Sequence, residues 1–479
     1  MNDRTKRLGK NTILVFAGNF SAKLILLLLL PFYTKWLSVE EYGLTDVITV
    51  YVTLLLGVAT CSIDAALFVF PKGCDKDKQK KYFSSSLTFV TFCLAVTAAI
   101  FVIIDFVLTY LGQTSNSFAD NIWLIYIMLS SQVLQVTIQQ FTRSIDKMVV
   151  YSTTGVLSTI CIALFAFLLI PKYGVTGYVA SISISNIVAS LYSFIASKSY
   201  RFFECKSFDM PSLKTMLLYS IPLIPNSVMW QLVGTLNRPV MEAYLDMHAI
   251  GIFAVANKFP SILTMVFNVF LTSWQISILE EYGKEGFAGF YNKIFRFLFV
   301  SLIIVLIFIT LISKILINIF ADSNFFESWK YVSILAIGVL FSSVAGLVGA
   351  LFSAVKQSKY YLYSTIVGGI IALSLNYLLI PLIGLWGASF SVVFSFLGVA
   401  LTRLCFSFKF AKLENMEMYI IYTVLAIAII VLYVTEVSIM TTIIVASLVI
   451  ALITYKEKDS VLKILIILKN KKNEISKSA

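Results

Sequence analysis

Three basic residues, Lys23, Arg238 and Lys258, stand inside long apolar stretches of the sequence. A cation at membrane depth costs a few kcal/mol even on lenient insertion scales, so it normally faces a bundle interior or a watery cavity. Such cations could belong to a functional site, or they could form internal salt bridges, Lys23 with Asp64 and Arg238 with Glu242 one helical turn away. The sequence therefore predicts either a polar site inside the bundle or buried ion pairs.

Polar residues accompany these cations at helical spacing. One stripe comprises Asp46, Thr49, Thr53, Gly57, Thr60 and Asp64, and a second comprises Asn257, Thr264, Asn268 and Gln275. Gln231, Gly234, Thr235 and Arg238 form a third set, with Asn237 alongside, and Asn19 lies one turn before Lys23. Residues spaced by three or four share one face of a helix. The stripes either line a polar path or join helices by hydrogen bonds. We expect Asp46, near the outer end of its helix, to be an interfacial residue.

The elements that carry these residues must be membrane helices. Of the 479 residues, 59% are hydrophobic and 13% charged, whereas a soluble domain has about 25% charged residues. Apolar runs of this length span the bilayer, and lipid requires each to satisfy its own backbone, as a helix does. The alternating pattern of a membrane β-barrel is absent. The sequence predicts an all-α membrane protein with about fourteen spans, near 12–36, 44–70, 82–111, 119–143, 149–171, 176–199, 214–244, 249–278, 293–317, 329–354, 360–381, 386–408, 417–435 and 438–455.

The basic residues predict the orientation. The segments assigned to the outside carry only Lys35, Lys172, Lys314 and Lys330 of the 37 Lys and Arg, so both termini are predicted to be cytoplasmic in a bacterial inner membrane. The cytoplasmic loops also account for the net charge of +12, and no nucleic-acid partner is expected. The first apolar run lacks a cleavage site and is expected to stay in the mature protein.

An internal repeat organises the chain. Leu168-Leu169-Ile170-Pro171-x-x-Gly174-x-x-Gly177 recurs as Leu378-Leu379-Ile380-Pro381-x-x-Gly384-x-x-Gly387, and Pro31, Leu37 and Gly43 recur with the same spacing as Pro239, Leu245 and Gly251. Either a parallel duplication produced two six-helix lobes, or helix corners simply reuse Pro and Gly. We favour duplication. The predicted organisation is a cytoplasmic N-terminus (1–11), an N-lobe (12–199), an inter-lobe linker (200–213), a C-lobe (214–408), two extra helices (417–455) and a basic, interfacial cytoplasmic tail (456–479).

Catalytic and metal chemistry find little support. The six cysteines form no C-x-x-C pair, and the one histidine, His248, falls in a short outer loop without an acid or nucleophile partner. We therefore expect no cofactor, no metal and no enzyme activity. Prolines at Pro31, Pro222, Pro225, Pro239 and Pro260 either bend helices or mark their starts.

Two segments carry a resemblance to a known family: Leu29 to Leu37 with Glu41-Tyr42-Gly43, and Ser220 to Pro225 through Asn237-Arg238 to Gly251-Ile252-Phe253. The chain resembles Wzx-type oligosaccharide flippases, polysaccharide biosynthesis proteins of the multidrug/oligosaccharidyl-lipid/polysaccharide (MOP) exporter superfamily with a MATE-like fold. Asn237 departs from the acidic residue that many relatives place before the arginine. The resemblance implies alternating access that moves an undecaprenyl-diphosphate-linked oligosaccharide to the outer leaflet for O-antigen, capsule or exopolysaccharide synthesis, with membrane lipid and polysaccharide polymerase machinery as partners.

The resemblance also implies roles for residues. Lys23, Arg238 and Lys258 would neutralise the diphosphate, while Asn19, Gln231, Asn257, Asn268 and Gln275 would bind sugar hydroxyls and Trp230 would stack on a sugar. Asp64 would serve coupling to a proton or sodium ion. A MATE-type drug/cation antiporter would need cavity carboxylates instead, and a lipid II flippase is not separable by sequence. A membrane enzyme such as a polymerase or acyltransferase would need a large outer loop or a catalytic histidine.

Overall fold

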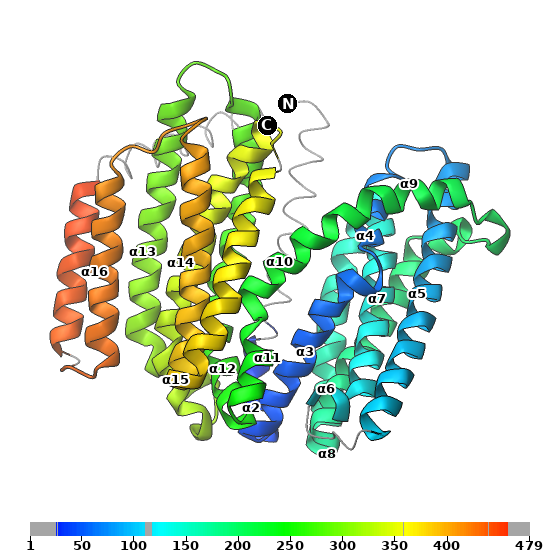
Figure 1. The fold of residues 1–479 in the computed structure, drawn as a ribbon, viewed down its shortest axis with the longest axis horizontal. Helices are drawn as coiled ribbons and strands as arrows, with labels where there is room; N and C mark the ends of the chain where they lie inside the picture. The colour runs from blue at the N-terminus through cyan, green and yellow to red at the C-terminus, as the bar shows by residue number, and fades with distance from the viewer. Residues whose placement is uncertain (1–24, 26, 111–116, 358, 439, 458–479) are drawn as a thin grey trace.

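The computed structural model describes residues 25, 27–110, 117–357, 359–438 and 440–457. Within these ranges every regular element is a helix. Two helical bundles stand side by side, the N-lobe and the C-lobe, and they lie closest to each other at the lower edge of Figure 1. The prediction of an all-α protein is confirmed.

The helices follow the chain from lobe to lobe. The N-lobe contains α2 (Leu30–Trp36), α3 (Val39–Ala59), α4 (Ile63–Val69), α5 (Lys76–Tyr110), α6 (Ser117–Asp120), α7 (Ile122–Ser144) and α8 (Met148–Ala196). Short 3-10 turns, η1 (Ser199–Phe202) and η2 (Cys205–Ser207), lead to α9 (Met210–Ser220), η3 (Ile221–Leu223), α10 (Ile224–Thr235) and α11 (Asn237–Tyr244). The C-lobe continues with α12 (Met247–Glu281), α13 (Phe287–Phe320), η4 (Ser323–Ser328), α14 (Trp329–Ala354), α15 (Lys359–Ser407) and α16 (Met416–Val434), followed by a helix over Met440–Glu457.

Eleven helices of the described chain are long and apolar enough to cross a membrane. Two of them, α8 and α15, have 49 residues each, about 74 Å if straight, more than twice the thickness of the hydrocarbon layer. Each of these two helices turns back at a glycine and therefore crosses the membrane twice. The eleven helices thus make thirteen crossings. The first predicted span, 12–36, lies largely outside the described residues. With that first span, the crossings agree with the prediction of about fourteen spans.

The two hairpins show that the repeat is structural. Gly174 in α8 has φ 54° and ψ −128°, and Gly384 in α15 has φ 57° and ψ −130°. A left-handed φ favours glycine because it lacks a Cβ. The arms of each hairpin are joined by a hydrogen bond between residues 39 positions apart, Thr153 to Tyr192 and Arg403 to Ser364. Identical turns and equivalent cross-links support duplication over chance reuse of Pro and Gly.

The second predicted span is not one continuous helix, contrary to expectation. Helix α3 ends at Ala59, and α4 begins at Ile63 after Cys61 and Ser62, which both have φ 50°. The backbone N–H of Ser62 donates to the carbonyl of Gly57 at 2.9 Å. This local bond compensates part of the interrupted helix ladder. The stripe from Asp46 to Asp64 is therefore divided between two helices.

The seventh predicted span is broken as well, at the expected prolines. Pro222 and Pro225 lie in the first turns of η3 and α10, where a missing backbone N–H is tolerated. By contrast, α12 continues through Pro260. In Figure 1, α9 and α10 run obliquely from the N-lobe to the centre of the molecule. The seventh span is thus an arm between the lobes.

The arm is fixed to the N-lobe at its first turn. Asp209 caps α9 by accepting from the backbone N–H of Ser212 at 3.0 Å, and the Ser212 hydroxyl also donates to it. These bonds, together with nearby Lys81, lower the pKa of Asp209 below its ordinary value. The backbone N–H of Asp209 donates to the hydroxyl of Ser85 on α5 at 2.8 Å. The linker therefore belongs to the N-lobe, whereas α11 lies with the C-lobe.

The last two helices pack beside the C-lobe. Glu457, which is buried, accepts from Arg296 on α13 at 2.6 and 2.8 Å and from the hydroxyl of Tyr422 on α16 at 3.1 Å. A bidentate pair of this kind fixes both position and angle. The predicted interfacial tail lies beyond Glu457, outside the described residues.

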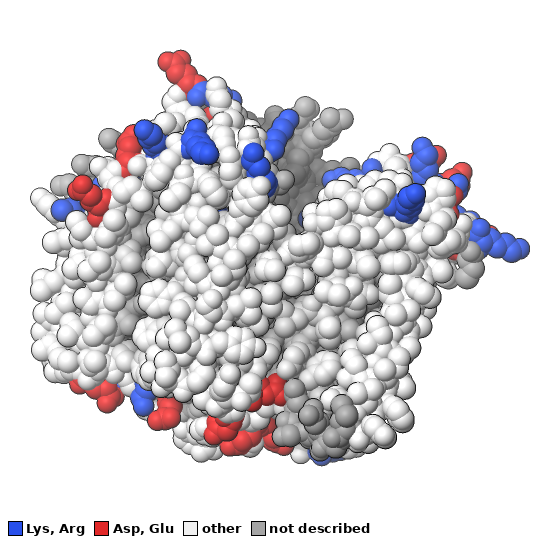
Figure 2. All heavy atoms as spheres, viewed as in Figure 1, with Lys and Arg blue, Asp and Glu red and all other residues white. Residues whose placement is uncertain are grey.

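The lobes meet where two equivalent glycines touch. A Cβ on Gly43 of α3 would lie 2.3 Å from the carbonyl of Met247, and one on Gly251 of α12 would lie 2.0 Å from the carbonyl of Val39. The backbones of α3 and α12 can approach this closely only without side chains. Figure 2 shows most of the visible Lys and Arg on the upper rim, mixed with Asp and Glu, whereas the charged groups of the lower rim are mostly Asp and Glu. By the charge rule, the glycine contact therefore marks the end predicted to face outward.

The glycine contact generates a test of the closed outer end. We expect Gly43→Ala to force α3 and α12 apart, at a cost of about 1–3 kcal/mol, the usual penalty for overpacking. The ratio of outer-closed to outer-open molecules should fall roughly 5- to 150-fold. Distances between spin labels on the outer ends of the lobes would measure this. Gly155→Ala is the control, because a Cβ there meets no neighbour within 4 Å. An unchanged distance distribution in Gly43→Ala would refute the close contact.

Candidate functional site

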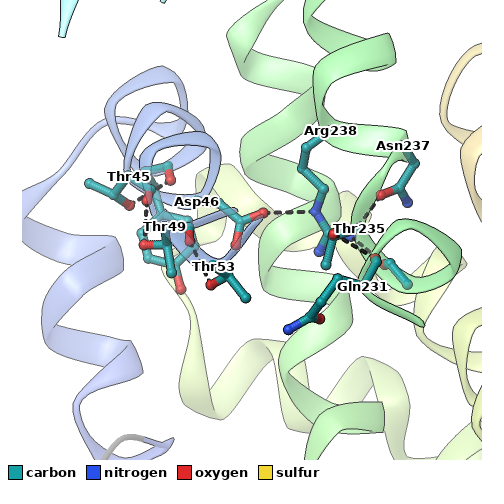
Figure 3. A network of polar contacts seen from close by, with 10 residues as sticks. Thr45, Asp46, Thr49, Thr53, Gln231, Thr235, Asn237 and Arg238 are labelled. Atoms are coloured by element: carbon teal, nitrogen blue, oxygen red, sulfur yellow. Dashed lines mark hydrogen bonds and ion pairs between the residues drawn. The ribbon is translucent and has the colours of Figure 1, made fainter. Parts of the chain in front are cut away.

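An ion pair joins the lobes near the glycine contact. Nε of Arg238 on α11 lies 3.0 Å from Oδ2 of Asp46 on α3, and the two side chains are 4% and 16% exposed. Figure 3 shows the carboxylate directed at the guanidinium across the lobe interface. Arg238 also stacks on Phe253, 4.8 Å from the ring centroid. Asp46 is therefore an inter-lobe partner rather than the interfacial residue that the sequence suggested.

The alternative pairing of Arg238 with Glu242 is wrong. The Glu242 carboxylate accepts from the hydroxyl of Tyr51 at 2.9 Å and from the backbone N–H of Ser117 at 2.7 Å. Both donors belong to the N-lobe, whereas Glu242 lies on α11. Each lobe thus supplies one carboxylate to the other. Asp46 of the N-lobe binds Arg238 of the C-lobe, and Glu242 on α11 accepts from the two N-lobe donors. The outer end of the molecule is held by polar bonds as well as by helix packing.

We call the Arg238–Asp46 ion pair the latch. Near it lie polar groups that lack a hydrogen-bond or ion-pair partner among the described residues. Oδ1 of Asn237 accepts from Arg238 at 2.9 Å, but its buried amide nitrogen has no hydrogen-bond acceptor among the described residues. Lys258 on α12 is half-buried, and its ammonium lies 5.9 Å from the centroid of Tyr42. No carboxylate pairs with Lys258 in the described chain. The latch region therefore contains a cation, Lys258, and an amide donor, that of Asn237, which form no salt bridge and no hydrogen bond, respectively, with the described residues.

Further predicted residues lie along two helices of the interface. Asn257, Asn268 and Gln275 follow α12, and the 18 positions from the first to the last cover about 27 Å, close to the thickness of the hydrocarbon layer. Gln231 lies on α10, two turns from Arg238, and Figure 3 shows its amide directed into the space between α10 and α3. Asn19 and Lys23 lie outside the described residues.

The threonines of the α3 stripe use their hydroxyl groups locally. Those of Thr49 and Thr53 donate to carbonyls four residues earlier, at 2.7 and 2.8 Å. Asp64 follows the break before α4, is partly exposed and forms no salt bridge with the described residues. The expected pairing of Asp64 with Lys23 falls on a residue outside the described chain.

One buried cation escaped the sequence analysis. Arg403, which lies within the predicted span 386–408 but was not singled out with the cations at membrane depth, is 4% exposed on α15. It donates to the Ser364 hydroxyl at 3.0 Å and the carbonyl of Ala345 at 2.9 Å, and its guanidinium lies 5.4 Å from the centroid of Trp230. Gly349 makes room, because a Cβ there would lie 2.8 Å from the guanidinium. The position of this arginine inside a predicted span was a usable signal.

Trp230 packs against C-lobe residues, a contact that the sequence did not predict. Its ring lies 5.7 Å from that of Phe396 and against Arg403, so the C-lobe holds one side of the indole. The side chain is still 37% exposed. The indole fixes α10 on the C-lobe and leaves part of one edge open for a further contact.

The fold has solved counterparts. A lipid II flippase, MurJ, in an inward closed conformation matches with a TM-score of 0.68 and 16% identity, over 95% of this chain and 99% of that chain. An inward-facing multidrug resistance MATE family transporter of the MOP superfamily matches with a TM-score of 0.62 and 15% identity, over 82% and 97%. An outward-facing one gives 0.57 and 14%, over 84% and 95%. The chain therefore has the same fold as this flippase and these transporters.

The sequence comparison gives the family. The sequence model described as polysaccharide biosynthesis protein matches residues 8–275, more than half of the chain, and the protein belongs to this family. A second model, MatE, matches residues 222–378. No curated protein sequence matches the chain.

A charge exchange would test the latch. Asp46→Asn leaves the Arg238 guanidinium buried without a carboxylate, and we expect the outer-closed state to lose on the order of 3 kcal/mol. The double variant Asp46→Arg/Arg238→Asp should restore the closed distance between the lobes. Spin-label distances report the closure, and Glu281→Gln, which breaks an exposed pair with Lys284, is the control. If Asp46→Asn stays as closed as the control, the pair is not a latch.

A double-mutant cycle would test the Arg403–Trp230 contact. We expect Arg403→Gln and Trp230→Phe to be coupled by about 0.5–2 kcal/mol, the range of partly desolvated cation–π contacts. Trp386 stacks on Tyr331, 5.0 Å away, and Trp386→Phe with Arg403→Gln should be additive within about 0.5 kcal/mol. Thermal unfolding in detergent measures all variants. Equal additivity in both cycles would contradict the contact.

Proposed function

We propose that the protein is a flippase that moves an oligosaccharide linked to undecaprenyl diphosphate from the cytoplasmic to the outer leaflet of the bacterial inner membrane. The observation that carries this proposal is the surplus positive charge at the latch: Arg238 is paired with Asp46, whereas Lys258, near the ring of Tyr42 one turn before Asp46, pairs with no carboxylate in the described chain. A diphosphate cannot cross hydrocarbon without compensation of its charge. The family and the flippase fold support the same class of substrate.

The latch gives the substrate a means of changing the conformation. A diphosphate that reaches Arg238 competes with Asp46 for the same guanidinium, and the amide of Asn237 offers it a further donor. A ligand shifts a conformational equilibrium only through different affinities for the two states. Here the anion binds the cations, and the closed outer end loses the Arg238–Asp46 ion pair. Binding therefore favours outward opening in the alternating-access cycle.

The remaining polar residues suit a saccharide. The amides of Asn257, Asn268 and Gln275 follow α12 over nearly the whole membrane, and the amide of Gln231 on the arm is directed into the space between α10 and α3. We assign these groups to sugar hydroxyls, with the exposed edge of Trp230 against a sugar ring. Lys23 and Asn19 would complete the site from the first span. The polyprenyl chain would remain in lipid between the lobes.

Two other functions share the fold. A drug/cation antiporter needs an available carboxylate at the site, but Asp46 is already paired with Arg238. A lipid II flippase carries the same diphosphate lipid, and the solved structure with a TM-score of 0.68 bears that name. Coupling to a proton or sodium ion through Asp64 is a further part of the proposal, since this carboxylate lacks a basic partner in the described chain.

A deletion strain tests the function. We expect surface polysaccharide to be lost and lipid-linked repeat units to accumulate on the cytoplasmic leaflet. The readouts are polymer staining and labelling of the repeat units from each side of the membrane. Normal polymer with increased sensitivity to cationic drugs would support the antiporter instead. Loss of viability, rescued by a known lipid II flippase, would support the peptidoglycan function.

Lys258 offers a test at the level of a residue. Lys258→Gln removes the cation that has no carboxylate partner in the described chain, and we expect polymer export to fall roughly tenfold or more, because charged hydrogen bonds contribute about 1.5–3 kcal/mol. Lys284→Gln, an exposed lysine on the cytoplasmic rim, is the control. Equal membrane levels of both variants must be verified. Wild-type export by Lys258→Gln, and by charge reversal of Lys23, Arg238 and Lys258 together, would refute the diphosphate site.

A further inference from the structure

A cavity lies in the N-lobe, away from the lobe interface. It has a volume of about 540 Å³ and is bounded by α5, α7 and the second arm of α8. The inter-lobe site uses α3, α10, α11 and α12 instead. A volume of this size is typical of a cavity that holds one small ligand. The cavity is therefore separate from the site that we propose for the saccharide substrate.

The walls of this N-lobe cavity are dry. Leu134 and Ile138 of α7 face Leu191 and Phe194 of α8, and the polar lining is minor. Two of the three hydroxyls at the wall are used internally: that of Thr91 donates to the carbonyl of Leu87 at 2.9 Å, and that of Ser190 donates to the carbonyl of Asn186 at 2.7 Å. Apolar cavities of this kind do not retain water. The lining therefore suits a hydrocarbon chain.

The cavity opens to the bilayer near its cytoplasmic side. Leu191 on its wall is 55% exposed, on a helix that crosses the membrane. The lining residues of α7 and α8 come from the last three turns of each helix, at the end where the positive charges gather. A lipid chain from the cytoplasmic leaflet can therefore enter from the side.

The inter-lobe linker closes the cytoplasmic end of the cavity. Phe203 lines the cavity and packs on the cluster of Phe83 and Phe141, whose rings are 4.0 Å apart. The Ser84 hydroxyl holds the linker in place by donating to the carbonyl of Phe202 at 3.1 Å and accepting from the backbone N–H of Glu204 at 3.0 Å. The closing wall is thus a built part of the N-lobe.

Basic side chains stand beside this closing wall. Lys198 follows α8 one turn after Phe194, and Arg201 lies in η1 two residues before Phe203; both are exposed. Neither pairs with a carboxylate in the described chain, whereas neighbouring Lys80 is bonded to Glu204. A phosphate headgroup near the membrane surface is attracted by such residues.

We propose that this cavity binds one acyl chain of an anionic phospholipid of the cytoplasmic leaflet, with the headgroup at Lys198 and Arg201. Lipid tails are as apolar as the cavity wall, so selectivity comes from the shape of the cavity and from the charge of the headgroup. Because the chain lies beneath the linker that leads to the arm, a bound lipid stabilises the docking of the linker on the N-lobe. The proposal does not depend on the identity of the transported substrate.

Native mass spectrometry of the full-length protein tests the site, with phosphatidylglycerol and phosphatidylcholine of identical chains as probes. We expect phosphatidylglycerol to be retained several-fold better, and Leu191→Trp, which places a larger ring at the mouth, to remove this preference. Leu164→Trp is the matched control, because Leu164 lies on the other arm of α8 with the same 55% exposure. Lys198→Gln/Arg201→Gln should reduce the preference for the anionic lipid without preventing retention of lipid.

Three results would overturn the proposal. The first is equal retention of the two lipids by the wild-type protein. The second is equal loss of lipid in Leu191→Trp and Leu164→Trp, with thermal unfolding unchanged in both. The third is displacement of phosphatidylglycerol by undecaprenyl diphosphate in the wild-type protein but not in Leu191→Trp, which would assign the cavity to the carrier lipid. None of these results bears on whether the deletion strain loses its polysaccharide.

Discussion

The cost of holding a charge in the membrane governs this structure. Arg238 is almost fully buried, and it is stable there because Asp46 of the other lobe lies 3.0 Å away and the ring of Phe253 covers the guanidinium. The partner comes from across the interface, so the charge is compensated only while the outer ends of the lobes are together. Closure of the outer end and solvation of this arginine are therefore one equilibrium. An anion that replaces Asp46 can separate the two.

Helix packing makes that ion pair geometrically possible. The glycines at equivalent places in the repeat let the backbones of α3 and α12 touch, and Asp46, one turn after Gly43, then lies within reach of Arg238 on α11. Duplication explains why the contact is reciprocal: each lobe supplies one glycine, one N-terminally capped helix and one hairpin with a left-handed glycine. Ser38 caps α3 and Asp246 caps α12 through the same type of bond to a backbone N–H. The scaffold is symmetric, so differences between the lobes lie in side chains.

Much of this architecture could be predicted from residue patterns, because lipid allows few backbone structures and because the repeat motifs are local. The hairpin glycines and the orientation of the charges are examples. The partner of Arg238 could not be predicted, since Glu242 was one turn away in the sequence and Asp46 was nearly two hundred residues distant. The break at Cys61 and Ser62 contains neither Pro nor Gly, and hydropathy does not detect it. Arg403 was missed because it lies close to the cytoplasmic end of its predicted span, where an arginine can also reach the membrane surface.

The two lobes have equivalent backbones but different charged side chains. Among the residues that we consider for the site, the described cations Arg238 and Lys258 belong to the C-lobe, while the carboxylates Asp46 and Asp64 belong to the N-lobe. The hairpins differ in the same sense: the C-lobe cross-link of Arg403 with Ser364 carries a charge, whereas the equivalent N-lobe cross-link of Tyr192 with Thr153 is neutral. A negatively charged ligand between the lobes would therefore bind the C-lobe and release the N-lobe. In the proposed cycle, this asymmetry would give the rigid-body motion its direction, because an anionic substrate would remain with the C-lobe while the N-lobe moves away.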